Sequence, residues 1–243
     1  MHRSYVEPAW IQAWLKDPKY AVPQEVSRRF IEIVRIKAHE KVGLFDGRGY
    51  QLEGLLVFDH NKKSYFLSDT QIKHVSLPTP QIILAQAACV ESKITETLRR
   101  GCEFGVDQFV IFNAQKSEAF CFNKLKKRHE RLEAVILDAA RQSERLIIPT
   151  LRFCDNYQEF LGPQGIFGDL KAEIRLSQAL KENFDPQADF LIIIGPEGGL
   201  SASEIAYLRE AKLSGVRFGP YTQRTELAGL AAVAIINAFC GRA

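Results

Sequence analysis

The stretch FLIIIGPEGGLSASEI, residues 190–205, places a run of apolar residues directly before a glycine-rich turn. Residues 190–194 have the composition of a buried strand. Ser201 and Glu204 have the spacing of a capping box, in which the serine caps a helix and the glutamate reaches back to the serine amide. The sequence therefore predicts a strand, a tight turn at 195–199 and a helix that starts at Ser201.

The turn itself, GPEGG at 195–199, combines three glycines with a proline and a carboxylate. Glycine adopts positive φ angles and lets a ligand approach the backbone, whose amides can then donate hydrogen bonds. The turn is not a phosphate loop, because no Gly-Lys-Ser/Thr follows, and it lacks the G-x-G-x-x-G of dinucleotide sites. A ligand site and a turn that merely needs glycine both remain open at this point.

The first part of the chain, residues 28–76, consists of short apolar segments separated by charged or glycine-containing turns. DGRG at 46–49 is a hairpin signal. We expect a small β-barrel or sandwich here, followed by a proline-containing linker at 76–81. The predicted strands are 29–36, 41–46, 50–59, 63–69 and 72–77.

After residue 80, strand-like segments alternate with helical patterns. This alternation predicts a parallel sheet that is covered by helices on both faces. Such sheets bind ligands beyond the carboxyl ends of their strands, which is where GPEGG and a second loop, GPYTQRTE at 219–226, would lie. The predicted strands are 81–88, 108–114, 145–149, 190–194 and 215–219, and the predicted helices are 92–103, 122–143, 169–182, 202–213 and 225–240.

The predicted helix at 225–240 is rich in alanine and also contains Gly229. Small residues permit close packing, either within one core or between two subunits. Arg224 directly precedes this helix. Most arginines lie on the surface without a further role, but the position of Arg224 beside a glycine turn at a strand's carboxyl end favours a functional one.

The composition excludes several classes of protein. With 243 residues, 46% hydrophobic and 25% charged residues, the chain resembles ordinary globular proteins. The five cysteines are scattered without a CxxC or zinc pattern, so we expect reduced, mostly buried thiols and no metal site. No apolar run is long enough to span a membrane, and the N-terminus lacks the core of a signal peptide. We expect a cytoplasmic protein without a membrane partner.

Several motifs together resemble one known family. The segments 192–205 and 218–236 are similar to the last two signature segments of SPOUT-class RNA methyltransferases, most closely the bacterial 16S ribosomal RNA uridine N3-methyltransferases. Glu103-Phe104-Gly105 resembles the family's Glu-Leu-Gly, and Gln142-Ser143-Glu144-Arg145 with Pro149 resembles its Gln-Ser-x-Arg-x-x-x-Pro. MHRSYV at 1–6 and residues 28–47 resemble its N-terminal RNA-binding region. The resemblance covers nearly the whole chain in the family's order.

The resemblance implies a fold of two domains. Residues 1–76 would form a PUA-like β-barrel that helps to hold RNA, and residues 77–243 a SPOUT α/β methyltransferase domain with a deep trefoil knot. General rules of chain connectivity reject knots, so the knot rests on the family alone. The family also works as a homodimer through its knotted domains, and the small-residue helix at 225–240 suits such an interface.

The resemblance further implies S-adenosylmethionine as the methyl donor, held by backbone amides of the knot loops. Glu197 would either orient its loop by bonding nearby amides, which we favour, or face the substrate. The cofactor-binding residues would be Ile194, Gly195, Pro196, Glu197, Gly198, Gly199, Phe218, Gly219, Pro220, Tyr221, Thr222, Gln223 and Ala228.

The implied reaction is methylation of N3 of a specific uridine in 16S ribosomal RNA, free or within the small ribosomal subunit. Uracil N3 must lose a proton, and a guanidinium would stabilise the resulting charge; Arg224 is the predicted catalytic residue. Glu226 would either favour the start of its helix, the first choice, or assist proton removal. The candidate RNA contacts are Arg3, Arg28, Arg29, Arg35, Lys116 and Arg145.

The sequence departs from the family pattern in the last loop, where two apolar residues are replaced by Thr222 and Gln223 and a later threonine by Leu227. Lys116 stands near the place of an arginine, so the charge is kept without the bidentate fork. These changes bear on cofactor affinity or target choice. The alternatives are an RNA-binding relative without methyl transfer, and a methyltransferase of the same fold that acts on another position such as a ribose 2′-hydroxyl.

Overall fold

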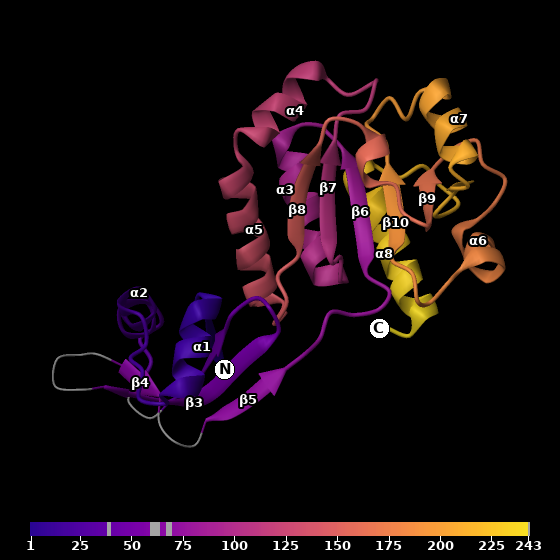
Figure 1. Cartoon of the computed structure of the whole chain (residues 1–243). Coiled ribbons are helices and arrows are strands. Elements are labelled where there is room, and N and C mark those ends of the chain that lie inside the picture. Colours follow the sequence, from indigo (N-terminus) through magenta and orange to yellow (C-terminus); the bar gives the residue numbers. More distant parts are fainter. Residues whose placement is uncertain (38–39, 59–63, 67–69, 243) are drawn as a thin grey trace. The chain divides into compact units, whose positions relative to one another are not determined.

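The computed structural model describes residues 1–37, 40–58, 64–66 and 70–242 (Figure 1). The chain divides into two compact units. Unit 1 contains Met1–Leu77 together with Ala140–Ile148, and unit 2 contains Pro78–Ala139 and Pro149–Ala243. The segment 140–148, which the sequence reading placed in the second domain, thus belongs to unit 1.

Unit 1 is built on a mostly antiparallel sheet. Strand β3 (Tyr50–Phe58) pairs with β2 (Lys41–Phe45), β4 (Ser64–Phe66) and β5 (Gln71–His74), and β1 (His2–Tyr5) runs parallel to β2. The expected hairpin between β2 and β3 is confirmed: its Asp46 carboxylate accepts hydrogen bonds from the amides of Arg48 and Tyr50. The strand β1 and the helix α1 (Pro8–Lys16) were not predicted.

The predicted strand at 29–36 is wrong. This segment continues the helix α2 (Gln24–Arg28) as a π-helix, η1 (Arg29–Val34). Val26, Phe30 and Val34 recur at every fourth residue, the spacing of one helical face, and all three belong to the apolar core of unit 1 or pack against it. Ile33 is 75% exposed, because in a helix it points away from that face.

The predicted strand at 145–149 is also absent from the parallel sheet. Instead the amide of Ile148 donates to the carbonyl of Gly47, and the amide of Gly49 donates to the carbonyl of Leu146. Ile147 forms an isolated antiparallel bridge with Arg48. The apolar run therefore pairs with the β2–β3 turn of unit 1, and the strand of unit 2 starts only afterwards, at Thr150.

Unit 2 contains the parallel sheet that the sequence predicts. Its six strands are all parallel, in the order β11-β9-β10-β6-β7-β8. One of them, β9, was not predicted. The strands are β6 (Ile82–Ala87), β7 (Gln108–Phe112), β8 (Thr150–Cys154), β9 (Gln164–Gly168), β10 (Phe190–Ile194) and β11 (Ser214–Val216).

Helices cover this sheet. The predicted helix at 122–143 is two helices, and the one at 169–182 forms only in its second half. The helices are α3 (Glu91–Phe104), α4 (Ala119–Lys126), α5 (His129–Gln142), α6 (Leu176–Asn183), α7 (Ala202–Glu210) and α8 (Thr225–Cys240), with a short 3₁₀ helix at Tyr157–Phe160.

The strand β10 lies at the centre of unit 2, and successive side chains of a strand point to opposite faces. Leu191 and Ile193 belong to the cluster that contains Leu208 of α7. On the other face α8 packs beside α3 (Figure 1). A Cβ atom at Gly229 of α8 would lie 2.7 Å from Leu84 Cδ1 of β6, so glycine permits this close packing of helix on sheet.

Candidate functional site

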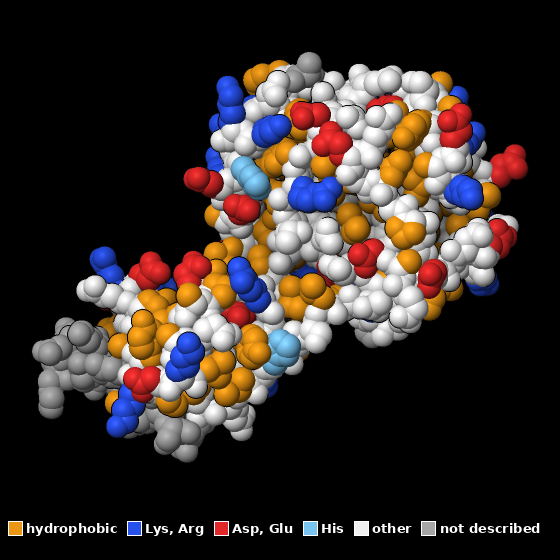
Figure 2. Space-filling view, viewed as in Figure 1, with side chains coloured by type: hydrophobic (Ala, Val, Ile, Leu, Met, Phe, Trp, Pro, Cys, Tyr) orange, Lys and Arg blue, Asp and Glu red, His pale blue; other side chains and the backbone are white. Residues whose placement is uncertain are grey.

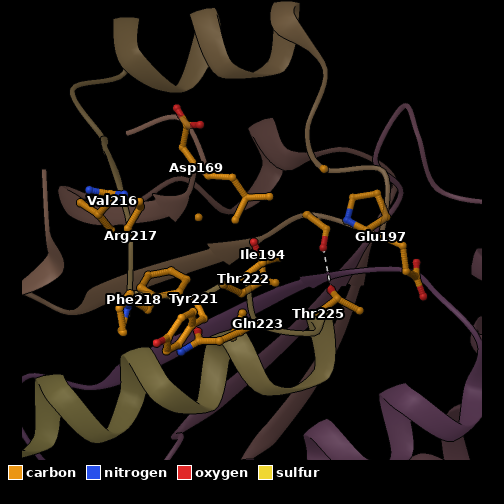
Figure 3. Close-up of a pocket in the computed structure, with 18 residues that line it drawn as sticks. Asp169, Ile194, Glu197, Val216, Arg217, Phe218, Tyr221, Thr222, Gln223 and Thr225 are labelled. Atoms are coloured by element: carbon orange, nitrogen blue, oxygen red, sulfur yellow. Dashed lines mark hydrogen bonds between the residues drawn. The ribbon is translucent and has the colours of Figure 1, made fainter. Parts of the chain in front are cut away.

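A cavity of about 230 Å³ lies at the carboxyl ends of β9, β10 and β11, which are neighbours in the sheet (Figure 3). Parallel sheets bind ligands at this edge. Every residue that the sequence assigns to cofactor binding lines the cavity, except Gly198. Chain segments that are far apart in the sequence, 194–199 and 216–223, thus meet around one space.

Six further residues line the cavity, and these were not predicted from the sequence. Three come from the last residue of β9 and the two residues after it, a strand whose sequence QGIFG carries too few apolar residues to be recognised. The other three come from the end of β11 and the first turn of α8. The missed residues are Gly168, Asp169, Leu170, Val216, Arg217 and Thr225.

Thr225 links the two glycine-containing turns. Its hydroxyl donates to the carbonyl of Gly195 at 2.7 Å, the dashed contact in Figure 3, and accepts from the side-chain amide of Gln86 at 2.9 Å. Gln86 is only 1% exposed, so this chain of bonds reaches from the middle of the sheet to the cavity wall. Hydrogen bonds between buried groups hold a structure in one arrangement.

The second turn, residues 219–223, offers backbone donors. Within the described part of the chain, the amides of Tyr221, Thr222 and Gln223 form no hydrogen bond with a protein group. Backbone amides without a partner cost free energy when they leave water, so a ligand with acceptor atoms would satisfy them. In the GPEGG turn, the amide of Gly199 donates to the carbonyl of Pro196, and Gly199 has a φ of +67°, which explains glycine at this position.

Glu197 points away from the cavity (Figure 3). Its carboxylate lies 2.7 Å from the Lys93 ammonium of α3, and the same ammonium lies 3.9 Å from Glu226. The hydrogen bond from Lys93 holds the pKa of Glu197 below its ordinary value, and the reciprocal bond raises the pKa of Lys93. The side chain of Glu197 therefore orients its loop mainly through this lysine, where we expected nearby amides.

The GPEGG turn is also held from its other side. The Lys116 ammonium, a predicted RNA contact, donates to the carbonyls of Gly198 and Leu200 at 3.1 and 3.2 Å. The predicted capping box is confirmed: Ser201 and Glu204 exchange side-chain and backbone hydrogen bonds at the start of α7. The second carboxylate oxygen of Glu204 accepts from the amide of Gln115 at 2.9 Å.

Arg224, the predicted catalytic residue, does not line the cavity. It is exposed and occupies the N-cap position of α8. No side-chain hydrogen bond or ion pair of Arg224 occurs within the described residues, so its guanidinium is available to a ligand from outside. Glu226 follows in the first turn of α8, where a carboxylate is favourable.

The predicted RNA contacts in unit 1 differ in exposure. Arg3 is buried at 8% exposure, and its guanidinium lies 4.8 Å above the Phe45 ring. Burial lowers the pKa of Arg3. Arg28 is exposed and forms an ion pair of 2.7 Å with Glu32. Arg29 is half-buried. Of these three arginines, Arg28 is the exposed one.

The other two predicted contacts of unit 1 are Arg35 and Arg145. Arg35 is exposed and ends the π-helix in a left-handed conformation with a φ of 59°. Arg145 is half-buried, and its Nε donates to the carbonyl of Ile147 at 3.3 Å. The structure thus presents Arg35 to solvent and ties Arg145 to its own segment.

The described residues show neither a disulfide, nor a cluster of metal ligands, nor a helix that could span a membrane. All five cysteines are free, four are buried, and burial raises the pKa of the Cys89 thiol to about 12. Among the described residues, no three His, Cys, Asp or Glu side chains come together as metal ligands would. No described helix is both long and apolar enough to cross a membrane.

Comparison with known proteins decides the family. Residues 76–237 match the family model of the RNA methyltransferase domain. The chain belongs to this RNA methyltransferase family. Among its curated relatives are proteins named ribosomal RNA small subunit methyltransferase E. That of Bacillus subtilis (strain 168) is 24% identical and matches over 90% of both chains, and that of Aquifex aeolicus (strain VF5) is 25% identical over 87% of this chain and 91% of its own.

Solved structures share the fold of this RNA methyltransferase. A ribosomal RNA small subunit methyltransferase E from Neisseria gonorrhoeae, bound to S-adenosyl methionine, superposes with a TM-score of 0.78 at 22% identity over 98% of both chains. A probable rRNA-methyltransferase from Porphyromonas gingivalis gives a TM-score of 0.78 at 23% identity, over 100% of this chain and 99% of that one. The likeness spans both units of the RNA methyltransferase.

Proposed function

We propose that this RNA methyltransferase uses S-adenosylmethionine to methylate N3 of a specific uridine in 16S ribosomal RNA. The observation that carries the proposal is the cavity at the carboxyl ends of β9, β10 and β11, whose second turn holds unpaired amides. The names of the relatives support small-subunit ribosomal RNA as the substrate. The ligand of the Neisseria gonorrhoeae structure supports the cofactor.

The residues present fit this cofactor. The amides of Tyr221, Thr222 and Gln223 would donate to its acceptor atoms, and the apolar side chains of Ile194 and Phe218 line the same space. When bound, S-adenosylmethionine supplies an activated methyl group. The protein then mainly has to align donor and acceptor. Thr225 and Lys116 contribute by fixing the two loops against each other and against the sheet.

At the acceptor, uracil N3 must lose its proton before or during transfer. The exposed guanidinium of Arg224 would stabilise the charge that spreads over the uracil carbonyl oxygens. Glu226 serves first as a favourable first-turn carboxylate of α8, and proton removal by it is the second candidate role. Reaching N3 of a paired uridine requires the base to leave its stack.

The finer features of the fold belong to the same proposal. Unit 1 would act as a PUA-like barrel that holds RNA, and the loops of unit 2 would form a trefoil knot around the cofactor. Two copies would associate through unit 2 as a homodimer. A protein that modifies ribosomal RNA of the small subunit would act in the cytoplasm.

Nucleoside mass spectrometry of ribosomal RNA from a deletion strain tests the reaction. We expect 3-methyluridine to disappear from 16S ribosomal RNA and to return when the gene is restored. Loss of a 2′-O-methylated nucleoside instead would show that the protein methylates a ribose 2′-hydroxyl. Calorimetry with S-adenosylmethionine separates both from an RNA-binding relative without methyl transfer, which would not bind the cofactor.

A further inference from the structure

Lys93 forms ion pairs with the GPEGG turn and with the start of α8 at the same time. It lies in the first turn of α3, and its ammonium is 2.7 Å from the carboxylate of Glu197 and 3.9 Å from that of Glu226. Glu197 belongs to the GPEGG turn, and Glu226 follows the second turn in the first turn of α8. One cation on a third element thus joins the two segments that enclose the cavity.

We propose that Lys93 is a positioning residue that holds the two loops at the spacing needed for cofactor binding. This inference rests on the proposed function, because it assumes that the cavity receives S-adenosylmethionine. Lys93 itself does not line the cavity. Its effect is therefore transmitted through the two glutamates and the backbone that carries them.

The surroundings of Glu226 explain why a cation is needed. The Glu226 side chain is only 12% exposed, and its Oε2 forms no hydrogen bond within the described part of the chain. Withdrawing a carboxylate from water is costly unless an opposite charge compensates. Lys93 is the ion-pair partner that the described residues provide for it. The nearby Cys89 thiol, with its high pKa, stays neutral and supplies no charge.

Without the ammonium, the Glu197 and Glu226 carboxylates, which lie 2.7 and 3.9 Å from it, would both lose their opposite charge. Like charges repel, and each would gain from moving toward water. The remaining ties, from Thr225 to Gly195 and from Lys116 to Gly198 and Leu200, hold only backbone carbonyls and compensate neither carboxylate. We therefore expect loss of Lys93 to loosen the loops without unfolding unit 2.

The experiment compares Lys93→Met with Lys93→Arg, which keeps the charge, and with a control, Arg99→Met. Arg99 lies on the same helix and forms an exposed ion pair of 3.5 Å with Glu96 of that helix. S-adenosylhomocysteine binding is measured by calorimetry, and hydrogen exchange of residues 195–200 is measured in the protein without ligand. Melting temperatures show that each variant is folded.

For Lys93→Met we expect about fivefold weaker binding, the range of a partly exposed ion pair, and faster exchange in residues 195–200. Lys93→Arg should recover most of both, and Arg99→Met should match the wild type. In the double variant Lys93→Met/Glu226→Gln the unpaired charge is gone, so binding should partly recover. If Lys93 contributed only the packing of its side chain, removing the Glu226 charge would not produce this recovery.

Unchanged binding and unchanged exchange in Lys93→Met would overturn the inference, as would a double variant that binds no better than Lys93→Met. If the wild type itself binds neither S-adenosylmethionine nor S-adenosylhomocysteine, the proposed function fails. The exchange measurement on the protein without ligand still decides in that case whether Lys93 holds the loops.

Discussion

At the scale of single residues, the hydroxyl of Thr225 is the smallest feature on which the site depends. It satisfies a carbonyl of the GPEGG turn and a buried amide of β6 at the same time. Thr225→Val keeps the shape but, among the described residues, leaves the Gly195 carbonyl without a partner and the Gln86 side-chain amide with only its bond of 3.4 Å to the Ala87 carbonyl. We therefore expect a loss of about 1–3 kcal/mol in the free energy of unfolding. Urea denaturation measures it.

Thr95→Val is the matched control for Thr225→Val. Thr95 is half-buried on α3 and has no hydrogen bond from its side chain within the described residues. Its replacement should change the free energy of unfolding far less. Equal effects of the two substitutions would mean that the hydroxyl of Thr225 contributes nothing specific.

The second prediction at this scale concerns Arg224, which lies outside the cavity wall. Arg224→Ala should reduce turnover by about 10²–10³-fold, the usual effect of removing one donor that stabilises developing charge. S-adenosylmethionine binding should stay largely intact, because Arg224 does not line the cavity. Calorimetry beside a methyl-transfer assay checks both statements, and loss of cofactor binding would refute the assignment.

Individual residues were predictable where a motif carried them. The cavity-lining positions of the two turns lie within contiguous, recognisable segments, so their joint location followed from the resemblance. Thr225 and Asp169 were missed because neither stands out by type, and only the folded chain brings them to the same wall. The burial of Arg3 could not be predicted either, because nothing in the sequence distinguishes an arginine that packs over a phenylalanine ring from one in solvent.

At the scale of elements, the start of α7 is held by one glutamate whose carboxylate accepts two backbone hydrogen bonds. Glu204 completes the capping box and also accepts the amide of Gln115, which comes from the loop after β7. Glu204→Ala keeps the bond from the amide of residue 204 to Ser201 Oγ but leaves the amides of Ser201 and Gln115 without their acceptor, about 1–3 kcal/mol each. We expect a total loss of about 2–6 kcal/mol, measured as the free energy of unfolding.

The control for this prediction lies at the other end of the same helix. Glu210 is exposed, and a negative charge near a helix C-terminus is slightly unfavourable. Glu210→Ala should therefore leave stability unchanged or raise it slightly. A loss similar to that of Glu204→Ala would show that α7 is sensitive to any change and that the cap is not special.

Helices and strands were predictable from the sequence where nearby residues determine them, and not where contacts with distant residues do. The strand β10 and the helix α8 have the predicted bounds, because an apolar run and a marked helix start define them within a few residues. The π-helix at 29–34 was read as a strand since its β-branched residues favour strands, while tertiary packing of every fourth residue decided otherwise. Residues 145–149 show the same limit, because their pairing partner is the turn at 47–49.

At the scale of the whole molecule, stability should fall in acid. Basic partners hold the pKa of three carboxyl groups below their ordinary value of 4.5: Glu53 beside Lys73, Glu91 beside Arg128, and Glu197 beside Lys93. A lowered pKa stabilises the folded state above the unfolded value of about 4.5 and loses this effect as pH falls through the folded value. The melting temperature should therefore decline below pH 4.5.

Glu197→Gln tests one part of this prediction. The variant should melt below the wild type at pH 7, and the difference should shrink as the pH falls, because the wild-type carboxylate becomes protonated as well. A difference that stays constant down to pH 3 would show that the Glu197 ion pair does not contribute to the acid response.

The charge pattern gives a further view of the whole molecule. On the face shown in Figure 2, acidic and basic side chains are interspersed over unit 2, in keeping with a net charge of only +3. Attraction of RNA by a broad field over this face is therefore weak. Local contacts of individual arginines would have to position the substrate.

The division into units leads to the last prediction. A fragment of residues 78–243 keeps the segment 140–148 but lacks Gly47 and Gly49, to which its backbone is hydrogen-bonded. The amide of Ile148 should be protected from hydrogen exchange in the full chain and unprotected in the fragment. Amides of β10 should remain protected in both, which controls for folding, and equal protection of Ile148 would contradict the prediction.

The return of residues 140–148 to unit 1 also bears on how such a gene can evolve. An exchange that replaced only the codons for residues 1–77 would bring in a foreign β2–β3 turn and leave the old pairing segment behind, encoded far downstream. The chimeric protein would fold correctly only if the new turn could pair with that segment. Residues 1–77 and 140–148 must therefore be inherited together, and this fold tolerates domain exchange less well than domains joined end to end.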